Sequence, residues 1–261
     1  MTPVAGADAT FQVLEALGRN RRKRRQRGEF LVHGVRPIDA ALGHGWPVTG
    51  VATAAGRRRS AWAEKVLART NGARRFDMPA ALFDQLADRD EPGELFLVAA
   101  LRSRSLDEVI GDGPVLVIDR PASPGNLGTL VRSADAFGAA GVVVLGHAAD
   151  LYDPRAVRAS VGSLFALPVI ELGGPADLAP WLAAAGRRVV GLDEQGARAI
   201  SEARSGAGGG VVVVLGNEAR GLSAAARALC HELVAIPMQA GGATSLNVAV
   251  AGSIALYELT R

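Results

Sequence analysis

The feature that most constrains the fold is a series of short apolar runs, separated by helical stretches, in the C-terminal half. They lie at residues 115–119, 141–145, 167–172, 188–192, 210–215 and 233–236. The run VVVVL at 211–215 shows no alternation of polar and apolar residues, which is typical of a strand covered on both faces. Strands that alternate with helices form a mostly parallel sheet between helical layers. We therefore predict an α/β domain over residues 114–261.

A smaller α/β domain is predicted over residues 1–101, with the polar, glycine-containing stretch 102–113 as a linker. The first 18 residues precede its pattern and are a candidate disordered segment. Its expected strands and helices alternate at residues 30–32, 37–42, 46–52, 60–69, 79–86 and 94–100.

Positive charge is concentrated at the N-terminal end. Residues 1–75 carry 15 Lys and Arg against 5 Asp and Glu, whereas residues 114–261 carry 11 against 12. A solvated or disordered tail would explain such a run, but an ordered segment follows it directly, which favours binding to RNA phosphates. The candidate RNA-binding residues are Arg19, Arg21, Arg22, Lys23, Arg24, Arg25 and Arg27.

Several function classes lack their signatures. No GxGxxG follows a predicted strand and no P-loop motif occurs, so ordinary dinucleotide and nucleotide sites are not indicated. The single cysteine and four scattered histidines have no metal-ligand spacing, so we expect no metal. No apolar stretch has the length of a signal peptide or a membrane span, so a cytoplasmic location is expected.

Three segments at predicted strand ends carry polar and glycine residues, and strand ends are where α/β sheets place their ligands. The segments are 119–138, 215–222 and 234–250, and their candidate catalytic residues are Asn126, Arg132, Glu218, Ser245 and Asn247. Helix capping would explain Asn126, Ser245 and Asn247 equally well. A carboxylate directly after a buried strand, as at Glu218, needs solvent or a partner and therefore favours a site.

Taken together, the segments PGNLGTLVRSA at 124–134, LGNEARGL at 215–222 and IPMQAGGATSLNVA at 236–249 resemble the SpoU-type ribose 2′-O-methyltransferases of the SPOUT superfamily. RASVGSLFALP at 158–168 is similar to a further family segment. Residues 19–101 resemble the family's substrate-binding domain, which is similar to an RNA-binding ribosomal protein. Segments such as GEFLVHGVRPI at 28–38 most resemble family members that methylate a 23S rRNA uridine and confer antibiotic resistance.

The resemblance implies a parallel sheet with a deep C-terminal trefoil knot, S-adenosylmethionine as cofactor, S-adenosylhomocysteine as product, and a homodimer. It also implies that Arg132 acts at the ribose 2′-hydroxyl, and that the cofactor contacts Leu215, Gly216, Asn217, Ile236, Met238 and Leu246. Because a guanidinium is essentially never deprotonated in proteins, we expect Arg132 to bind a phosphate and orient the hydroxyl. Two alternatives remain open: a tRNA or housekeeping rRNA methyltransferase, and a non-catalytic RNA-binding protein.

Overall fold

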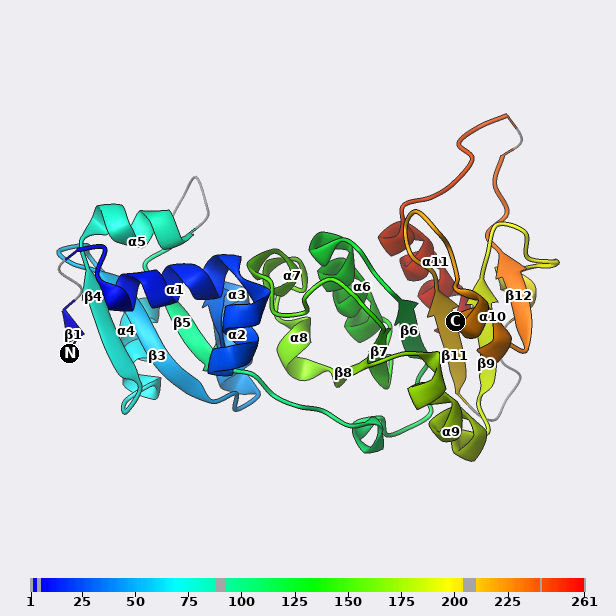
Figure 1. Ribbon diagram of the computed structural model, residues 1–261, viewed down its shortest axis with the longest axis horizontal. Helices are drawn as coiled ribbons and strands as arrows, with labels where there is room; N and C mark the ends of the chain where they lie inside the picture. The colour runs from blue at the N-terminus through cyan, green and yellow to red at the C-terminus, as the bar shows by residue number, and fades with distance from the viewer. Residues whose placement is uncertain (1, 4–5, 88–92, 204–209, 240, 261) are drawn as a thin grey trace. The chain divides into compact units, whose positions relative to one another are not determined.

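The computed structural model describes residues 2–3, 6–87, 93–203, 210–239 and 241–260 (Figure 1). The chain forms two compact units. The first unit contains residues 1–102 together with 150–166, and the second contains residues 103–149 and 167–261.

The first unit has a five-stranded sheet in the order β1-β4-β3-β5-β2. Within this sheet β2 and β3 both run antiparallel to β5, whereas β4 runs parallel to β3. Its strands are β1 (Thr2–Pro3), β2 (Glu29–His33), β3 (Val48–Ala54), β4 (Arg74–Met78) and β5 (Leu95–Ala100). Its helices are α1 (Ala9–Arg19), α2 (Arg21–Arg27), α3 (Val35–Gly43), α4 (Ala61–Arg69), α5 (Ala80–Ala87), α7 (Pro154–Ala159) and α8 (Ser163–Ala166).

The expectation of disorder before residue 19 is wrong for the described part of that segment, because helix α1 occupies Ala9–Arg19. The Asp8 side chain caps this helix by accepting from the Thr10 and Phe11 amides at 2.9 and 3.0 Å. Phe11, Leu14 and Leu17 are buried in the core of the unit. This i, i+3, i+6 set of apolar residues holds the helix in place.

The predicted domain boundary is also wrong at one segment, because residues 150–166 pack with the first unit and not with residues 114–149. The Arg24 guanidinium donates to the Asp150 carboxylate at 2.7 Å, and both side chains are buried. The ring of Phe30 packs 4.7 Å from Tyr152 and 6.3 Å from Phe165, measured between centroids. Burial of these aromatic rings and of the ion pair fixes the segment where it lies.

The second unit has a seven-stranded sheet in the order β10-β12-β9-β11-β6-β7-β8, and every strand pair is parallel, as predicted. Its strands are β6 (Val115–Asp119), β7 (Gly141–Leu145), β8 (Val169–Leu172), β9 (Arg188–Leu192), β10 (Arg198–Ala199), β11 (Val211–Leu215) and β12 (Glu232–Ala235). Its helices are α6 (Pro124–Ala136), α9 (Pro175–Ala185), α10 (Ala224–Leu229) and α11 (Val248–Thr260), with short 3₁₀ turns η1 (Leu106–Glu108) and η2 (Ile200–Glu202).

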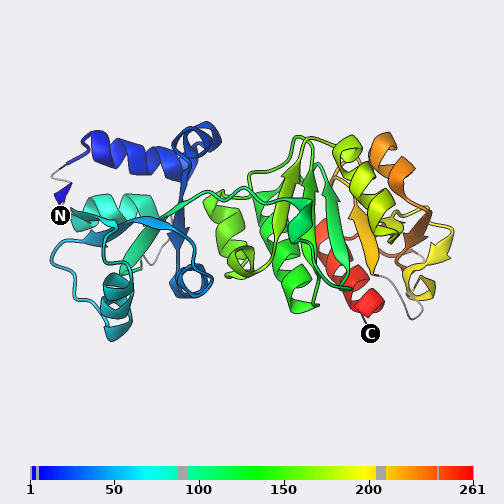
Figure 2. The same cartoon turned by 90° about the horizontal axis from the view of Figure 1, so that it is seen from below.

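Helices cover both faces of this sheet (Figure 2). Leu178 of α9 and Ala226 of α10 pack with Val117 and Val214 in one buried cluster. On the opposite face α11 lies so close to α6 that a Cβ at Gly252 would stand 2.4 Å from the Leu130 side chain. The central strands are therefore buried on both sides, which explains their continuous apolar runs. The predicted knot stays a prediction.

Among the described residues, no helix combines the length and the apolar character needed to cross a membrane. Neither do those residues form a group of three or more His, Cys, Asp or Glu side chains able to hold a metal ion.

Candidate functional site

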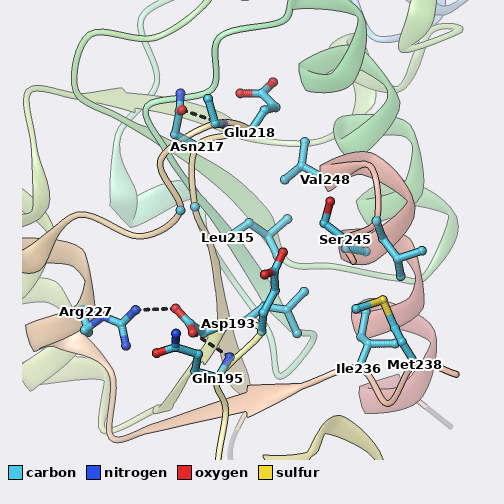
Figure 3. A pocket seen from close by; sticks show the side chains of 17 residues that line it. Asp193, Gln195, Leu215, Asn217, Glu218, Arg227, Ile236, Met238, Ser245 and Val248 are labelled. Atoms are coloured by element: carbon cyan, nitrogen blue, oxygen red, sulfur yellow. Dashed lines mark hydrogen bonds and ion pairs between the residues drawn. The ribbon is translucent and has the colours of Figure 1, made fainter. Parts of the chain in front are cut away.

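A pocket of about 510 Å³ opens at the C-terminal ends of β9, β11 and β12. This is the edge of a parallel sheet where ligands bind, and the volume falls in the range of small-molecule sites. Its lining includes all six residues predicted to contact a cofactor, namely Leu215, Gly216, Asn217, Ile236, Met238 and Leu246. The lining residues come from the chain after β9, the turn after β11, Arg227 of α10, and the chain between β12 and the first turns of α11, so separate stretches of chain form one cavity (Figure 3).

The loop after β11 is held in a tight turn. The backbones of Asn217 and Gly221 exchange two hydrogen bonds, of 3.0 and 2.9 Å. A Cβ at Gly216 would lie 2.2 Å from the Gly221 carbonyl carbon, so this position accepts glycine alone. The backbone of Gly216 consequently borders the pocket with no side chain in the way.

Glu218 lies on this turn and ties it to the start of α6. Its carboxylate accepts hydrogen bonds from the Ala122 and Ser123 amides at 2.8 and 3.0 Å, and from the Asn126 side chain at 3.1 Å. Burial alone would raise the pKa of Glu218, but these hydrogen bonds outweigh it and hold the pKa below its ordinary value. A carboxylate that stays ionised and is engaged by three donors is suited to fixing the loop and poorly suited to accepting a proton.

Asn126 and Asn247 extend the same network. Asn247 donates to the Asn126 side-chain oxygen at 3.2 Å, and its own oxygen accepts from the Ala249 amide at 2.8 Å. The final helix therefore begins at Val248 with Asn247 as its cap, so helix capping explains Asn247 and not Ser245. Asn126 lies in the first turn of α6, whose cap is Ser123 and not Asn126. The three predicted segments are thus joined by side-chain hydrogen bonds.

A second set of contacts joins β6 to the same loop. The buried Asp119 carboxylate accepts from the Ser223 amide at 2.7 Å and from the Arg120 guanidinium at 3.1 Å. Burial raises the pKa of Asp119, but the Arg120 and Ser223 hydrogen bonds prevail and lower it. Arg120 itself has φ 54°, a conformation rare outside glycine, and its carbonyl accepts from the Asn217 side chain at 2.7 Å.

The structure places the predicted catalytic residues unequally around the pocket. Ser245 and Glu218 line it, whereas Asn126 and Asn247 support its rim through the hydrogen bonds above. Arg132 is exposed on α6, does not line the pocket, and makes no hydrogen bond or ion pair within the described residues. The Arg132 side chain is therefore available to interact with a group outside the pocket of its own chain.

One wall of the pocket was not foreseen from the sequence. It consists of Asp193, Glu194 and Gln195, directly after β9, together with Arg227 of α10. The rule that parallel strands place ligands at their C-terminal ends would have found residues 193–195, since β9 was predicted to end at Leu192. No sequence signal points to Arg227.

The basic run forms α2, which is capped by the Asn20 side chain and ends at Gly28 in the left-handed conformation. Arg24 is an error in the RNA-binding prediction, because its buried guanidinium is occupied by Asp150 and by the Leu17 carbonyl. Arg19 pairs with Glu15 at 3.0 Å. The basic side chains that α2 exposes are Arg22, Lys23, Arg25 and Arg27, while Arg21 is half-buried.

Comparison with known proteins agrees with this geometry. Residues 113–257 match the model of the SpoU rRNA Methylase family, and residues 8–97 match the SpoU L30e-like domain. The chain is 42% identical over 266 residues to the 23S rRNA (uridine(2479)-2′-O)-methyltransferase of Streptomyces viridochromogenes, covering 99% of this chain and 91% of that protein.

Two solved structures are similar over nearly the whole chain. The SpoU methyltransferase AviRb from Streptomyces viridochromogenes in complex with the cofactor AdoMet has a TM-score of 0.89 at 41% identity and covers 97% of each chain. An AdoMet-bound rRNA methyltransferase from Sinorhizobium meliloti has a TM-score of 0.87 at 29% identity, covering 99% of this chain and 97% of the other. This chain belongs to the SpoU rRNA methylase family.

Proposed function

We propose that this protein is an S-adenosylmethionine-dependent RNA 2′-O-ribose methyltransferase whose substrate is a uridine of 23S rRNA. The observation that carries the proposal is that the family segments 215–222 and 236–249 line one pocket at the C-terminal edge of the sheet, while the segment 124–134 is joined to both by the hydrogen bonds of Asn126. The 42% identity to an enzyme named for this reaction supports both the reaction and the class of RNA.

The pocket residues suit S-adenosylmethionine. Leu215, Ile236 and Leu246 give an apolar surface for the adenine ring, while the Gly216 backbone allows close approach. Three carboxylates and one guanidinium line the pocket, so its net charge is negative, which favours a cationic ligand. When bound, the cofactor supplies a methyl group on a positively charged sulfur, and the ribose 2′-oxygen takes this methyl group as the carbon–sulfur bond breaks and S-adenosylhomocysteine leaves.

Arg132 has the chemistry to orient the RNA. Its planar guanidinium binds a phosphate through two hydrogen bonds and stays protonated throughout. By binding the phosphate beside the target ribose, Arg132 also orients the 2′-hydroxyl. The proton of this hydroxyl passes to that phosphate or to water. Asn126, Glu218 and Asn247 hold the loops that shape the site, and Ser245 lines it.

The first unit supplies affinity for RNA. The exposed side chains of α2 attract the phosphate backbone through release of counterions, without reading the base sequence. Within the described residues, the side chains of Arg22 and Lys23 have no protein partner, so both are available for phosphates. The proposed rRNA substrate supports a cytoplasmic location, and the resemblance of residues 28–38 to resistance methyltransferases supports a role in antibiotic resistance.

We also propose a homodimer in which Arg132 serves the pocket of the partner subunit. Two observations support it: Arg132 is exposed away from its own pocket, and α11 exposes Val250 (48%) and Tyr257 (47%). The prediction is testable by mixing an Arg132→Ala subunit with a Gly216→Val subunit. Each homodimer should be inactive, and the mixture should regain activity because one hybrid pocket has both Gly216 and Arg132.

The test of the proposed function is transfer of labelled methyl from S-adenosylmethionine to 23S rRNA, 16S rRNA and total tRNA. The variants are Arg132→Ala and, as a matched exposed arginine of the same unit, Arg198→Ala. Label on one 23S uridine ribose that is lost with Arg132→Ala and kept with Arg198→Ala would support the proposal.

Label on tRNA alone would overturn the 23S substrate and favour the tRNA alternative. Absence of label on every RNA, with rRNA binding retained, would favour the non-catalytic alternative. The presence of all five predicted catalytic residues and of a formed pocket argues against that outcome.

A further inference from the structure

The pocket wall formed by residues 193–195 is a short turn that the Asp193 carboxylate holds from within. The Asp193 Oδ1 atom accepts from the Gln195 amide at 2.9 Å, and the Asp193 backbone carbonyl accepts from the Gly196 amide at 3.0 Å. The Asp193 amide donates to the Val234 carbonyl of β12 at 3.0 Å. A Cβ at Gly196 would lie 2.2 Å from the Val234 carbonyl carbon, so the turn packs directly on β12.

The outer oxygen of the same carboxylate pairs with a residue of another element. Asp193 Oδ2 accepts from the Arg227 guanidinium of α10, and both residues line the pocket (Figure 3). The Asp193 side chain is 13% exposed and that of Arg227 is 44% exposed. An ion pair with one half-buried partner loses less to screening by water than a pair on the open surface.

Helix α10 connects this wall to the opposite one. It begins directly after the Asn217–Leu222 turn, and its cap, Ser223, is fixed by the buried Asp119 carboxylate. Arg227 lies one turn further along α10 and grips Asp193. One six-residue helix therefore spans from the loop after β11 to the loop after β9, and both loops line the pocket.

We infer that Asp193 and Arg227 are a positioning pair that sets the shape of the cofactor pocket. Asp193 organises the 193–196 turn, and Arg227 locks that turn to α10 at the distance that the cofactor requires. This inference rests on the proposed function for the identity of the cofactor. Because the pair is assigned to positioning and not to methyl transfer, its loss should weaken cofactor binding and leave the rate at saturating cofactor intact.

The test uses the full-length protein with Asp193→Asn, Arg227→Met and the double variant, and measures the Kd of S-adenosylmethionine by calorimetry. Asparagine keeps the acceptor for the Gln195 amide and removes the ion pair alone. Each single variant should raise Kd by about two- to fivefold, and the double variant by no more than either single one. Arg227→Lys should restore most of the affinity, and kcat at saturating cofactor should stay within about twofold of the wild type.

Arg104→Met is the matched control, because it breaks an ion pair with Glu108 in the same unit at a distance from the pocket lining. Its Kd should equal that of the wild type. Additive effects of the two single variants, or an unchanged Kd in both, would overturn the inference.

A second measurement separates this inference from the proposed function. Hydrogen exchange of the Gln195 and Gly196 amides in the cofactor-free protein should accelerate in Arg227→Met relative to Arg104→Met. Equal exchange in the two variants would overturn the positioning pair even if the enzyme proves active. If the wild type binds no S-adenosylmethionine but exchange at these amides responds to Arg227→Met, the proposed cofactor is wrong and the pair itself stands.

Discussion

Replacement of Asp150 by alanine should destabilise the first unit far more than a typical loss of an ion pair. The Arg24 residue is 2% exposed, and Asp150 accepts from two of its guanidinium nitrogens at 2.7 Å each. In Asp150→Ala the positive charge stays buried, with the Leu17 and Gly18 carbonyls at 2.8 and 3.4 Å and the Asp153 carboxylate at 3.8 Å as its remaining partners. Because an unpaired buried charge costs about 3–5 kcal/mol, and Asp153 compensates in part, we expect a loss of about 3 kcal/mol.

Urea unfolding followed by tryptophan fluorescence measures this loss. Trp46 is buried in the first unit, where it packs 5.1 Å from the Phe165 ring, and it reports on the region around Asp150. Trp62→Phe and Trp181→Phe in the background remove the other two indoles, so that the signal comes from the first unit alone. The unfolding midpoint should fall, and the thermal midpoint should drop by roughly 10 °C.

Two further variants decide whether burial of the charge is the cause. Arg155→Met breaks the exposed pair with Asp153 and should cost less than about 1 kcal/mol. The double variant Arg24→Met/Asp150→Leu removes both charges and should be more stable than Asp150→Ala. The reasoning is refuted if Asp150→Ala costs no more than Arg155→Met, or if the double variant is the less stable of the two.

Three other predictions concern titration and charge. The pKa of Asp119 is lowered in the folded protein, so the ionised carboxylate stabilises the fold fully above the unfolded pKa of about 4, and this stabilisation is lost as the pH falls through the folded pKa. The difference in unfolding free energy between wild type and Asp119→Asn, measured by urea titration, should therefore shrink from pH 6 to pH 3. Burial raises the pKa of the Cys230 thiol to about 11, against a smaller opposing effect of Arg227, so Cys230 should react with a disulfide reagent at pH 8 at least about tenfold more slowly than free cysteine, and at the ordinary rate in urea. Lys23→Ala should reduce the slope of log K against log salt for rRNA binding, measured by filter retention. Because Arg24 is buried, Arg24→Met should leave that slope unchanged under conditions in which the variant is still folded.

The central sheet was predictable because its physical signal is local. The run at 211–215 is apolar throughout, since α11 packs on one face of β11 and the cluster with Ala226 lies on the other. Strand β4 was missed for the opposite reason. Its sequence RRFDM places exposed or half-buried charged side chains beside Phe76 and Met78, and a segment so rich in charge does not predict a strand.

The pocket divides in the same way. Its apolar and glycine lining could be assigned because family motifs carry it, and those residues follow strands with a strong pattern. Arg227 could not be assigned, because its importance depends on Asp193, which lies 34 positions away in the chain. The hydrogen bonds that join Asn126 to Glu218 and to Asn247 are equally non-local, so the sequence could indicate these residues as candidates but not the network that connects them.

The buried Arg24 shows why a charge run is an incomplete guide to an RNA surface. The sequence RRKRRQR of α2 gives no reason to single out one cation. A packed helix nevertheless has a buried face, and on that face of α2 Arg24 contacts the carboxylate of Asp150, which belongs to the segment 150–166. The segment leaves the second unit after β7 and returns to it at β8, so a stretch of chain between two strands of the second unit completes the first unit. Loss of Asp150 should for that reason disturb both the fold of the first unit and the presentation of its exposed cations, whereas loss of Arg22 or Lys23 should affect RNA binding alone.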